Sequence, residues 1–314
     1  MRNILLAIIT LLLVACTEQK PAGTNSTAQH GKPRVVASNY PLYSFTNEIA
    51  GDSITVGFPE IEGDPAMWAP GGFDADLLQS ADLLILNGAG YESWLAFTTL
   101  PVDSSLDTTA KLGAKLLPIE NETVHQHGPG GAHSHQGVAF TTWLDPQLAV
   151  EQARAITIGL SDLASGQSAD YQSGFEQLSQ RLLQLDQSLN QALIDLDGQP
   201  VIFSHPVYQY LQERYSINGQ SVHWEPDLEP GTKEWIDFGK LLRKHPARIM
   251  FWEDTPLDSV RQKLNEMGVE SFVFNPAGNT PHEGDYFSVM EQNLLAVKQA
   301  SAFVNEHTTV ISDK

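Results

Sequence analysis

Short apolar runs alternate with amphipathic segments along the first half of the chain. Four runs have the length and composition of buried strands, and they lie at 34–38, 53–58, 82–87 and 115–119. The segments with helical spacing lie at 43–50, 74–80, 91–97 and 145–164. Strands that alternate with helices indicate parallel βαβ units, so this half is predicted to form an α/β lobe.

The second half repeats this alternation. Its predicted strands are 200–204, 219–224, 248–252 and 270–275. Its predicted helices are 207–215, 232–245, 259–267 and 285–305. This pattern predicts a second α/β lobe of the same kind.

A long amphipathic stripe lies between the two halves. Apolar residues recur there at spacings of three and four, at Tyr171, Phe175, Leu178, Leu182, Leu185, Leu189, Leu193 and Leu196. This spacing predicts one long helix, and because the chain has only one such segment, a connecting helix is favoured over a coiled coil. The predicted fold class is therefore α/β, with two βαβ lobes joined by a single long helix. The expected boundaries are 34–166, 167–198 and 199–314.

The N-terminus has the pattern of a secretory signal. A basic Arg2 precedes an apolar run at 4–15 that is too short for a stable membrane anchor. The run ends in LVAC, and Cys16 is the only cysteine, so it has no partner for a disulfide within the chain. LVAC resembles the lipobox of bacterial lipoproteins, which predicts a signal peptide at 1–16, lipidation of Cys16 and a periplasmic location at the cell-envelope membrane. An ordinary cleaved signal is the alternative.

Composition limits the possible partners. Residues 17–33 are polar and rich in Thr, Gln, Gly and Pro, which predicts a disordered tether. The chain has 18 basic and 38 acidic residues and a net charge of -20. This charge repels nucleic acid and anionic membrane surfaces and attracts cations. We therefore expect no nucleic-acid partner, and membrane contact only through the lipid anchor.

A histidine-rich loop at 124–137 indicates metal binding. It reads VHQHGPGGAHSHQG and holds His125, His127, His133 and His135. Neutral imidazole is the commonest protein ligand for zinc, and the glycines and proline are expected to oppose helix and strand. His125 and His127 are expected to act as mobile metal ligands. The alternative is a solvated linker that binds metal weakly.

Signatures of hydrolytic catalysis are absent from the sequence. It has no HExxH, no GxSxG and no cysteine beyond Cys16, so zincin, serine-hydrolase and thiol mechanisms lack their motifs. We expect a binding protein rather than an enzyme, and a metallohydrolase is the least favoured alternative.

Several motifs together resemble the metal-binding solute receptors of bacterial ABC importers. They are SNYPLYSFTNEIAGD at 38–52, DPAMWAP at 64–70, ADLLILNGAGYESW at 81–94, WLDP at 143–146, SHPVYQYLQERYSI at 204–217 and EPGTKEW at 229–235. The resemblance extends from about residue 34 to the C-terminus. It implies two α/β lobes joined by one rigid helix, a bound zinc ion or, less expected, manganese, an ABC permease in the inner membrane as partner, and a monomer.

The chain departs from the ligand pattern of that family. The resemblance implies a site of about three imidazoles and one carboxylate, but three of the four positions fall on Ala66, Thr141 and Asn275. Only His205 matches directly. Methyl, hydroxyl and amide groups are poor substitutes for these zinc ligands. The histidine loop ends a few residues before Thr141, so we expect it to reach the vacated place.

The departures leave two interpretations. In the first, zinc is bound by His205 together with His133 and His135 from the loop and a carboxylate such as Glu253, with His223 as a further candidate. In the second, the site is vestigial and the chain binds another small ligand or none. A metal buffer or chaperone that works without a transporter differs from a transport receptor only in its partner.

Overall fold

The computed structural model describes residues 31–59, 61, 68–98, 104–119, 124–126, 132–134 and 137–312. Its first sheet consists of short strands of three or four residues. Its strands, in the order β2-β1-β3-β4, are all parallel. They are β1 (Arg34–Ala37), β2 (Thr55–Gly57), β3 (Leu83–Leu86) and β4 (Ser105–Asp107). Helices α1 (Tyr40–Ala50) and α2 (Gly72–Gln79) connect the first three strands, as expected of βαβ units.

The second sheet has the strand order β10-β9-β7-β8 and is also parallel. Its strands are β7 (Val201–Phe203), β8 (Gly219–Ser221), β9 (Ile249–Trp252) and β10 (Glu270–Val273). The helices between them are α5 (Gln209–Tyr215), α6 (Thr232–Lys244) and α7 (Asp258–Glu266). Strands β7 and β9 are fully buried, as their unbroken apolar sequences require at the centre of a parallel sheet.

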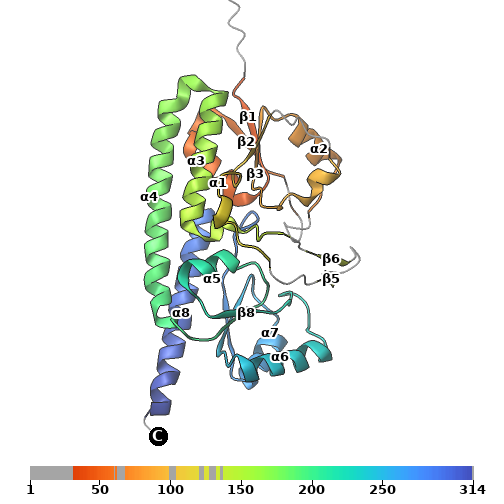
Figure 1. Ribbon diagram of the computed structural model, residues 1–314, viewed down its shortest axis with the longest axis vertical. Helices are drawn as coiled ribbons and strands as arrows, with labels where there is room; N and C mark the ends of the chain where they lie inside the picture. The colour runs from red at the N-terminus through yellow and green to blue at the C-terminus, as the bar shows by residue number, and fades with distance from the viewer. Residues whose placement is uncertain are drawn as a thin grey trace, which may run out of the picture. The chain divides into compact units, whose positions relative to one another are not determined.

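A long helix, α4 (Ser168–Leu193), links α3 (Pro146–Leu163) to the second sheet (Figure 1). It packs against α1, α3 and the C-terminal helix α8 (Tyr286–Ser312). Every residue of its predicted apolar stripe is buried. The prediction of two βαβ lobes joined by one long helix is confirmed. The exact lobe boundaries stay a prediction.

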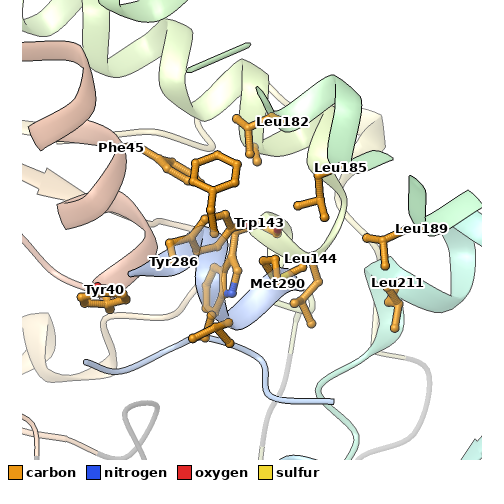
Figure 2. Packing of buried hydrophobic residues seen from close by; sticks show 14 of the residues in the cluster. Tyr40, Phe45, Trp143, Leu144, Leu182, Leu185, Leu189, Leu211, Tyr286 and Met290 are labelled. Carbon is orange, nitrogen blue, oxygen red and sulfur yellow. Dashed lines mark hydrogen bonds between the residues drawn. The ribbon is translucent and has the colours of Figure 1, made fainter. Parts of the chain in front are cut away.

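The main core lies where α4, α1, α8 and the segment before α3 meet (Figure 2). Phe45 packs edge-on against Tyr286, with ring centroids 5.0 Å apart. Trp143 is buried beside them, and its Nε1 donates to the main-chain oxygen of Pro276 at 2.7 Å. Because Trp143 precedes α3 and Pro276 follows β10, this hydrogen bond joins the two lobes.

Helix boundaries follow local capping. Asp145 accepts a hydrogen bond from the main-chain nitrogen of Gln147, so α3 begins beside the predicted residue. Asn39 caps α1 in the same way, and the helix therefore begins earlier than its apolar spacing predicted. Short 3-10 helices lie at η1 (Gly51–Ser53), η3 (Ser93–Ala96), η5 (Gly113–Lys115), η7 (Thr142–Leu144), η8 (Ser165–Gln167) and η9 (Ile194–Leu196).

Two predicted elements were wrong. Residues 115–119 are not the fourth strand, which is the less apolar β4. Instead, the 115–119 segment pairs locally with the chain returning from the histidine loop, through the hydrogen bond from Ala139 nitrogen to Leu117 oxygen. The predicted helix at 91–97 is only the short η3, because Glu92 is buried and its carboxylate binds back to the main chain of Asn87 and Gly88.

Candidate metal centre

Three neighbouring strands of the second sheet are each followed by residues of metal-binding type. His205 follows β7, His223 and Glu225 follow β8, and Glu253 directly follows β9. Strand β7 lies between β8 and β9, and the three strands are parallel. Their carboxyl ends therefore meet at one edge of the sheet, which is where ligands bind in open α/β sheets.

The side chains at this edge form a compact cluster. His205 Nδ1 lies 3.4 Å from Glu253 Oε1 and 3.9 Å from Glu225 Oε1. One ligand atom from each of the three residues lies within 4.8 Å of the others. The rings of His205 and His223 are 5.5 Å apart between centroids. We name His205, His223, Glu225 and Glu253 the metal cluster.

These spacings suit a metal ion. In tetrahedral zinc sites the donors lie about 2 Å from the ion and hence about 3.4 Å from one another. The separation between His205 Nδ1 and Glu253 Oε1 has this value, and that between His205 Nδ1 and Glu225 Oε1 is 0.5 Å longer. Within the described ranges, no other group of three or more histidine, cysteine or acidic side chains has comparable geometry.

Main-chain hydrogen bonds hold the strand ends in place. Ser204, directly before His205, donates its N–H to the oxygen of Phe251 in β9 at 2.8 Å. Its own oxygen accepts from Trp224, which lies between His223 and Glu225, also at 2.8 Å. The main chain beside all three strand ends is thus connected, so the cluster has a largely preformed scaffold.

Charge at the site also favours a cation. Glu225 and Glu253 place two carboxylates beside one imidazole, and both are partly exposed while His205 is almost buried. Burial, together with the charge of Glu253, raises the pKa of Tyr208 well above its ordinary value. The neutral hydroxyl of Tyr208 donates to the oxygen of Phe274 at 2.7 Å. Tyr208 therefore stays neutral, and the negative charge beside His205 comes from Glu225 and Glu253.

Two of the residues at positions where the family resemblance implies metal ligands make hydrogen bonds to the main chain. Thr141 is buried, and its hydroxyl donates to the oxygen of Val207 at 2.5 Å. The side-chain oxygen of Asn275 accepts from the nitrogen of Ala277 at 2.7 Å, closing a local turn. Ala66 lies outside the described residues.

The histidine loop contains a short antiparallel pair, β5 (Val124–Gln126) with β6 (Ala132–Ser134), in which His125 is opposite His133. The expectation that this loop opposes strand structure was wrong for these two triplets. The physical reason is that Pro129 and three of the glycines lie between the triplets, which contain neither residue type.

The structure describes only part of the predicted loop site. The side chains of His125 and His133 lie outside the described part, as do His127 and His135, so their roles as ligands stay predictions. The same holds for Cys16 and the signal peptide. The root of the loop is fixed to α5, because the hydroxyl of Tyr210 donates to the oxygen of Ala139 at 2.9 Å and accepts from the nitrogen of Leu117 at 3.2 Å.

A family model described as zinc-uptake complex component A, periplasmic, matches residues 35–300. The chain belongs to this family. Membership confirms the resemblance seen in the motifs. The family's proteins are described as a component of an uptake complex, which agrees with the expectation that the chain is not an enzyme. No helix among the described residues is long and apolar enough to cross a membrane.

Curated relatives of the family are similar over most of this chain. The zinc-binding lipoprotein AdcA of Streptococcus pneumoniae (strain ATCC BAA-255 / R6) is 26% identical in an alignment of 310 positions, which covers 95% of this chain and 60% of AdcA. The chain thus spans about three fifths of that relative's length. The high-affinity zinc uptake system protein ZnuA of Bacillus subtilis is 24% identical, and the alignment covers 94% of this chain and 95% of ZnuA.

Solved structures share the fold. Zn(II)-bound AdcA from Streptococcus pneumoniae aligns with a TM-score of 0.73 and 24% identity, over 86% of this chain and 58% of that one. FpvC from Pseudomonas aeruginosa in complex with Mn2+ aligns with a TM-score of 0.69 and 21% identity, over 87% and 100% of the two chains. These likenesses confirm the predicted fold class.

Glu225 is the member of the cluster that was not predicted from the sequence. His205, Glu253 and His223 were predicted candidates, and the structure brings these three together. The missed signal was the alternation in SVHWEP, where residues two apart after an extended strand point to the same side. His223 already marked that side, so Glu225 was the next residue to consider.

Proposed function

We propose that this chain is an extracytoplasmic receptor that captures a divalent transition-metal ion, zinc in the first place, and delivers it to an ABC permease. The observation that supports this proposal is the cluster of His205, Glu225 and Glu253 within 4.8 Å of one another. His223 is the proposed fourth ligand. In this proposal the cargo is bound at the sheet edge of the C-terminal lobe.

The donor set favours zinc over manganese. Two imidazoles and two carboxylates supply the mixed nitrogen and oxygen ligands of tetrahedral zinc sites, and imidazole sites hold zinc more tightly than manganese. The names of AdcA and ZnuA also refer to zinc. Manganese is the second choice, and FpvC is a relative in fold that has been solved with this ion.

The histidine loop has a proposed role in capture. His125, His127, His133 and His135 would raise the concentration of imidazole near the cluster, with His133 and His135 as the ones that contact the ion. The attachment of the loop root to α5 through Tyr210 supports this, because α5 follows the turn that holds His205.

Location and partner complete the proposal. Lipidation of Cys16 would anchor the protein to the cell-envelope membrane, with residues 17–33 as a tether and the receptor acting as a monomer. The family description as a periplasmic component of an uptake complex supports this location.

Calorimetry with zinc on protein freed of metal tests the proposal. We expect one tight site per chain, in addition to weak binding by the loop, and His205→Ala is expected to remove the tight site. His282→Ala, which removes an exposed imidazole outside the cluster, is the matched control and is expected to bind like the wild type. Binding that is weak throughout, lost on deletion of residues 124–136 and indifferent to His205→Ala, would refute the proposal and leave the loop as an unspecific metal binder.

A further inference from the structure

Thr141 connects the N-terminal lobe to the turn that holds His205. Its hydroxyl donates to the oxygen of Val207 at 2.5 Å, and Val207 lies two residues after His205, between β7 and α5. We propose that Thr141 is a positioning residue, which holds His205 in the geometry that binds the metal ion. This inference rests on the metal site proposed above and adds a residue from the opposite lobe to it.

Thr141 is itself rigidly held by buried polar groups. On one side, the oxygen of Phe140 accepts from Asn87 Nδ2 at 2.9 Å. On the other, the hydroxyl of Thr142 donates to Gln152 Oε1 at 3.0 Å, and Gln152 Nε2 donates to Asn87 Oδ1 at 3.1 Å. Asn87, Thr142 and Gln152 are fully buried, where such hydrogen bonds are strong and costly to break. The N-terminal lobe therefore presents the Thr141 hydroxyl in a defined place.

The receiving turn transmits this constraint to His205. Main-chain hydrogen bonds of Ser204 fix the start of the turn to the sheet. Pro206 lies between His205 and Val207, and its ring locks one backbone dihedral, which reduces independent motion of the two neighbours. The Thr141 hydroxyl binds the oxygen of Val207 from outside the lobe. Loss of this bond is expected to let Val207 and His205 move together.

Two substitutions separate the effect of the Thr141 hydroxyl from that of the side-chain shape. Thr141→Val keeps the shape and removes the donor, whereas Thr141→Ser keeps the donor. We expect Thr141→Val to weaken zinc binding about tenfold with an unchanged stoichiometry, because groups that orient metal ligands typically contribute 10–100-fold to affinity. Thr141→Ser is expected to bind close to the wild type.

A matched variant separates positioning from general stability. Thr157 is also buried, and its hydroxyl donates to the oxygen of Ala153 within α3 at 2.9 Å, away from the cluster. Thr157→Val makes the same chemical change, and its zinc affinity is expected to be unaltered even where its thermal stability falls. Equal weakening in Thr141→Val and Thr157→Val, or wild-type affinity in Thr141→Val, would overturn the inference.

Hydrogen exchange without metal gives an independent result. The Ser204 and Trp224 amides, which hold the turn, are expected to exchange faster in Thr141→Val and to keep their wild-type rates in Thr141→Ser and Thr157→Val. Unchanged rates in Thr141→Val contradict the inference whether or not zinc binds. If the wild type lacks a tight zinc site, the proposed function fails. Faster exchange in Thr141→Val would then show that the hydrogen bond from Thr141 to Val207 only stabilises the fold, which also overturns the positioning role.

Discussion

The buried carboxylate of Glu92 makes the stability of the protein depend on pH. Glu92 is 6% exposed and accepts hydrogen bonds from the Ser38 hydroxyl and from the main-chain nitrogens of Asn87 and Gly88. Burial raises the pKa of Glu92 from an ordinary 4.5 to about 7, against the lowering effect of these hydrogen bonds. Asn87 belongs to the polar network that holds Thr141, so this carboxylate supports the site's scaffold.

The sign and size of the effect follow from that pKa. Because the pKa of Glu92 is higher in the folded state, the folded protein retains the proton more strongly than the unfolded chain. The stabilisation is complete below pH 4.5 and is lost as pH rises to about 7. The pKa difference corresponds to a loss of about 3 kcal/mol in the free energy of unfolding.

Urea unfolding of the wild type and Glu92→Gln at several pH values between 4.5 and 8 measures this term. The amide cannot ionise, so the stability of Glu92→Gln relative to the wild type is expected to increase by about 3 kcal/mol over this range. In Glu92→Gln, a donor that faces the amide nitrogen loses its acceptor, which lowers the free energy of unfolding by about 1–3 kcal/mol at every pH. Glu176→Gln, on the exposed side of α4, controls for the change of side chain. A difference between wild type and Glu92→Gln that stays constant across the range would refute the reasoning.

Two further predictions concern helix packing and the metal. Gly174 in α4 lies against the main chain of Ile49 in α1, and a Cβ added at Gly174 would be 2.8 Å from the Cα of Ile49. Gly174→Ala is therefore expected to lower the free energy of unfolding by about 1–2 kcal/mol. Gly239→Ala in α6, where the atom nearest to the added Cβ is 4.0 Å away, is expected to raise the free energy of unfolding by about 0.5–1 kcal/mol. Urea unfolding in which both substitutions change the stability in the same direction would contradict this prediction. Zinc at about 100 times its dissociation constant is expected to stabilise the wild type by about 2.7 kcal/mol, reversibly with a chelator, and to leave His205→Ala unshifted in thermal unfolding.

The location of the metal cluster differs from the pattern implied by the family resemblance. His205 is the direct match, but His223, Glu225 and Glu253 come from the same C-terminal sheet. The side chains of Thr141 and Asn275, where the resemblance implies metal ligands, are instead engaged in hydrogen bonds to the main chain.

Most of the helices and strands could be predicted from local pattern. The apolar stripe from Tyr171 to Leu196 predicted α4 because helical periodicity depends only on neighbouring residues. The strand at 115–119 failed because its apolar residues pack around Tyr210, far away in sequence. The true edge strand β4 has a single apolar residue, Leu106, and becomes a strand through its hydrogen bonds to β3.

The α/β class and the two lobes with their connecting helix follow from the sequence alone, which also predicts candidate metal ligands. These properties depend on periodicity, capping and composition, which are local. Tertiary packing alone places Glu225 beside His205 and Glu253, because the order β9-β7-β8 brings three separate strand ends to one edge. It also decided the place of Thr141, since a hydrogen bond between lobes depends on how distant segments pack and leaves no periodic trace in the chain.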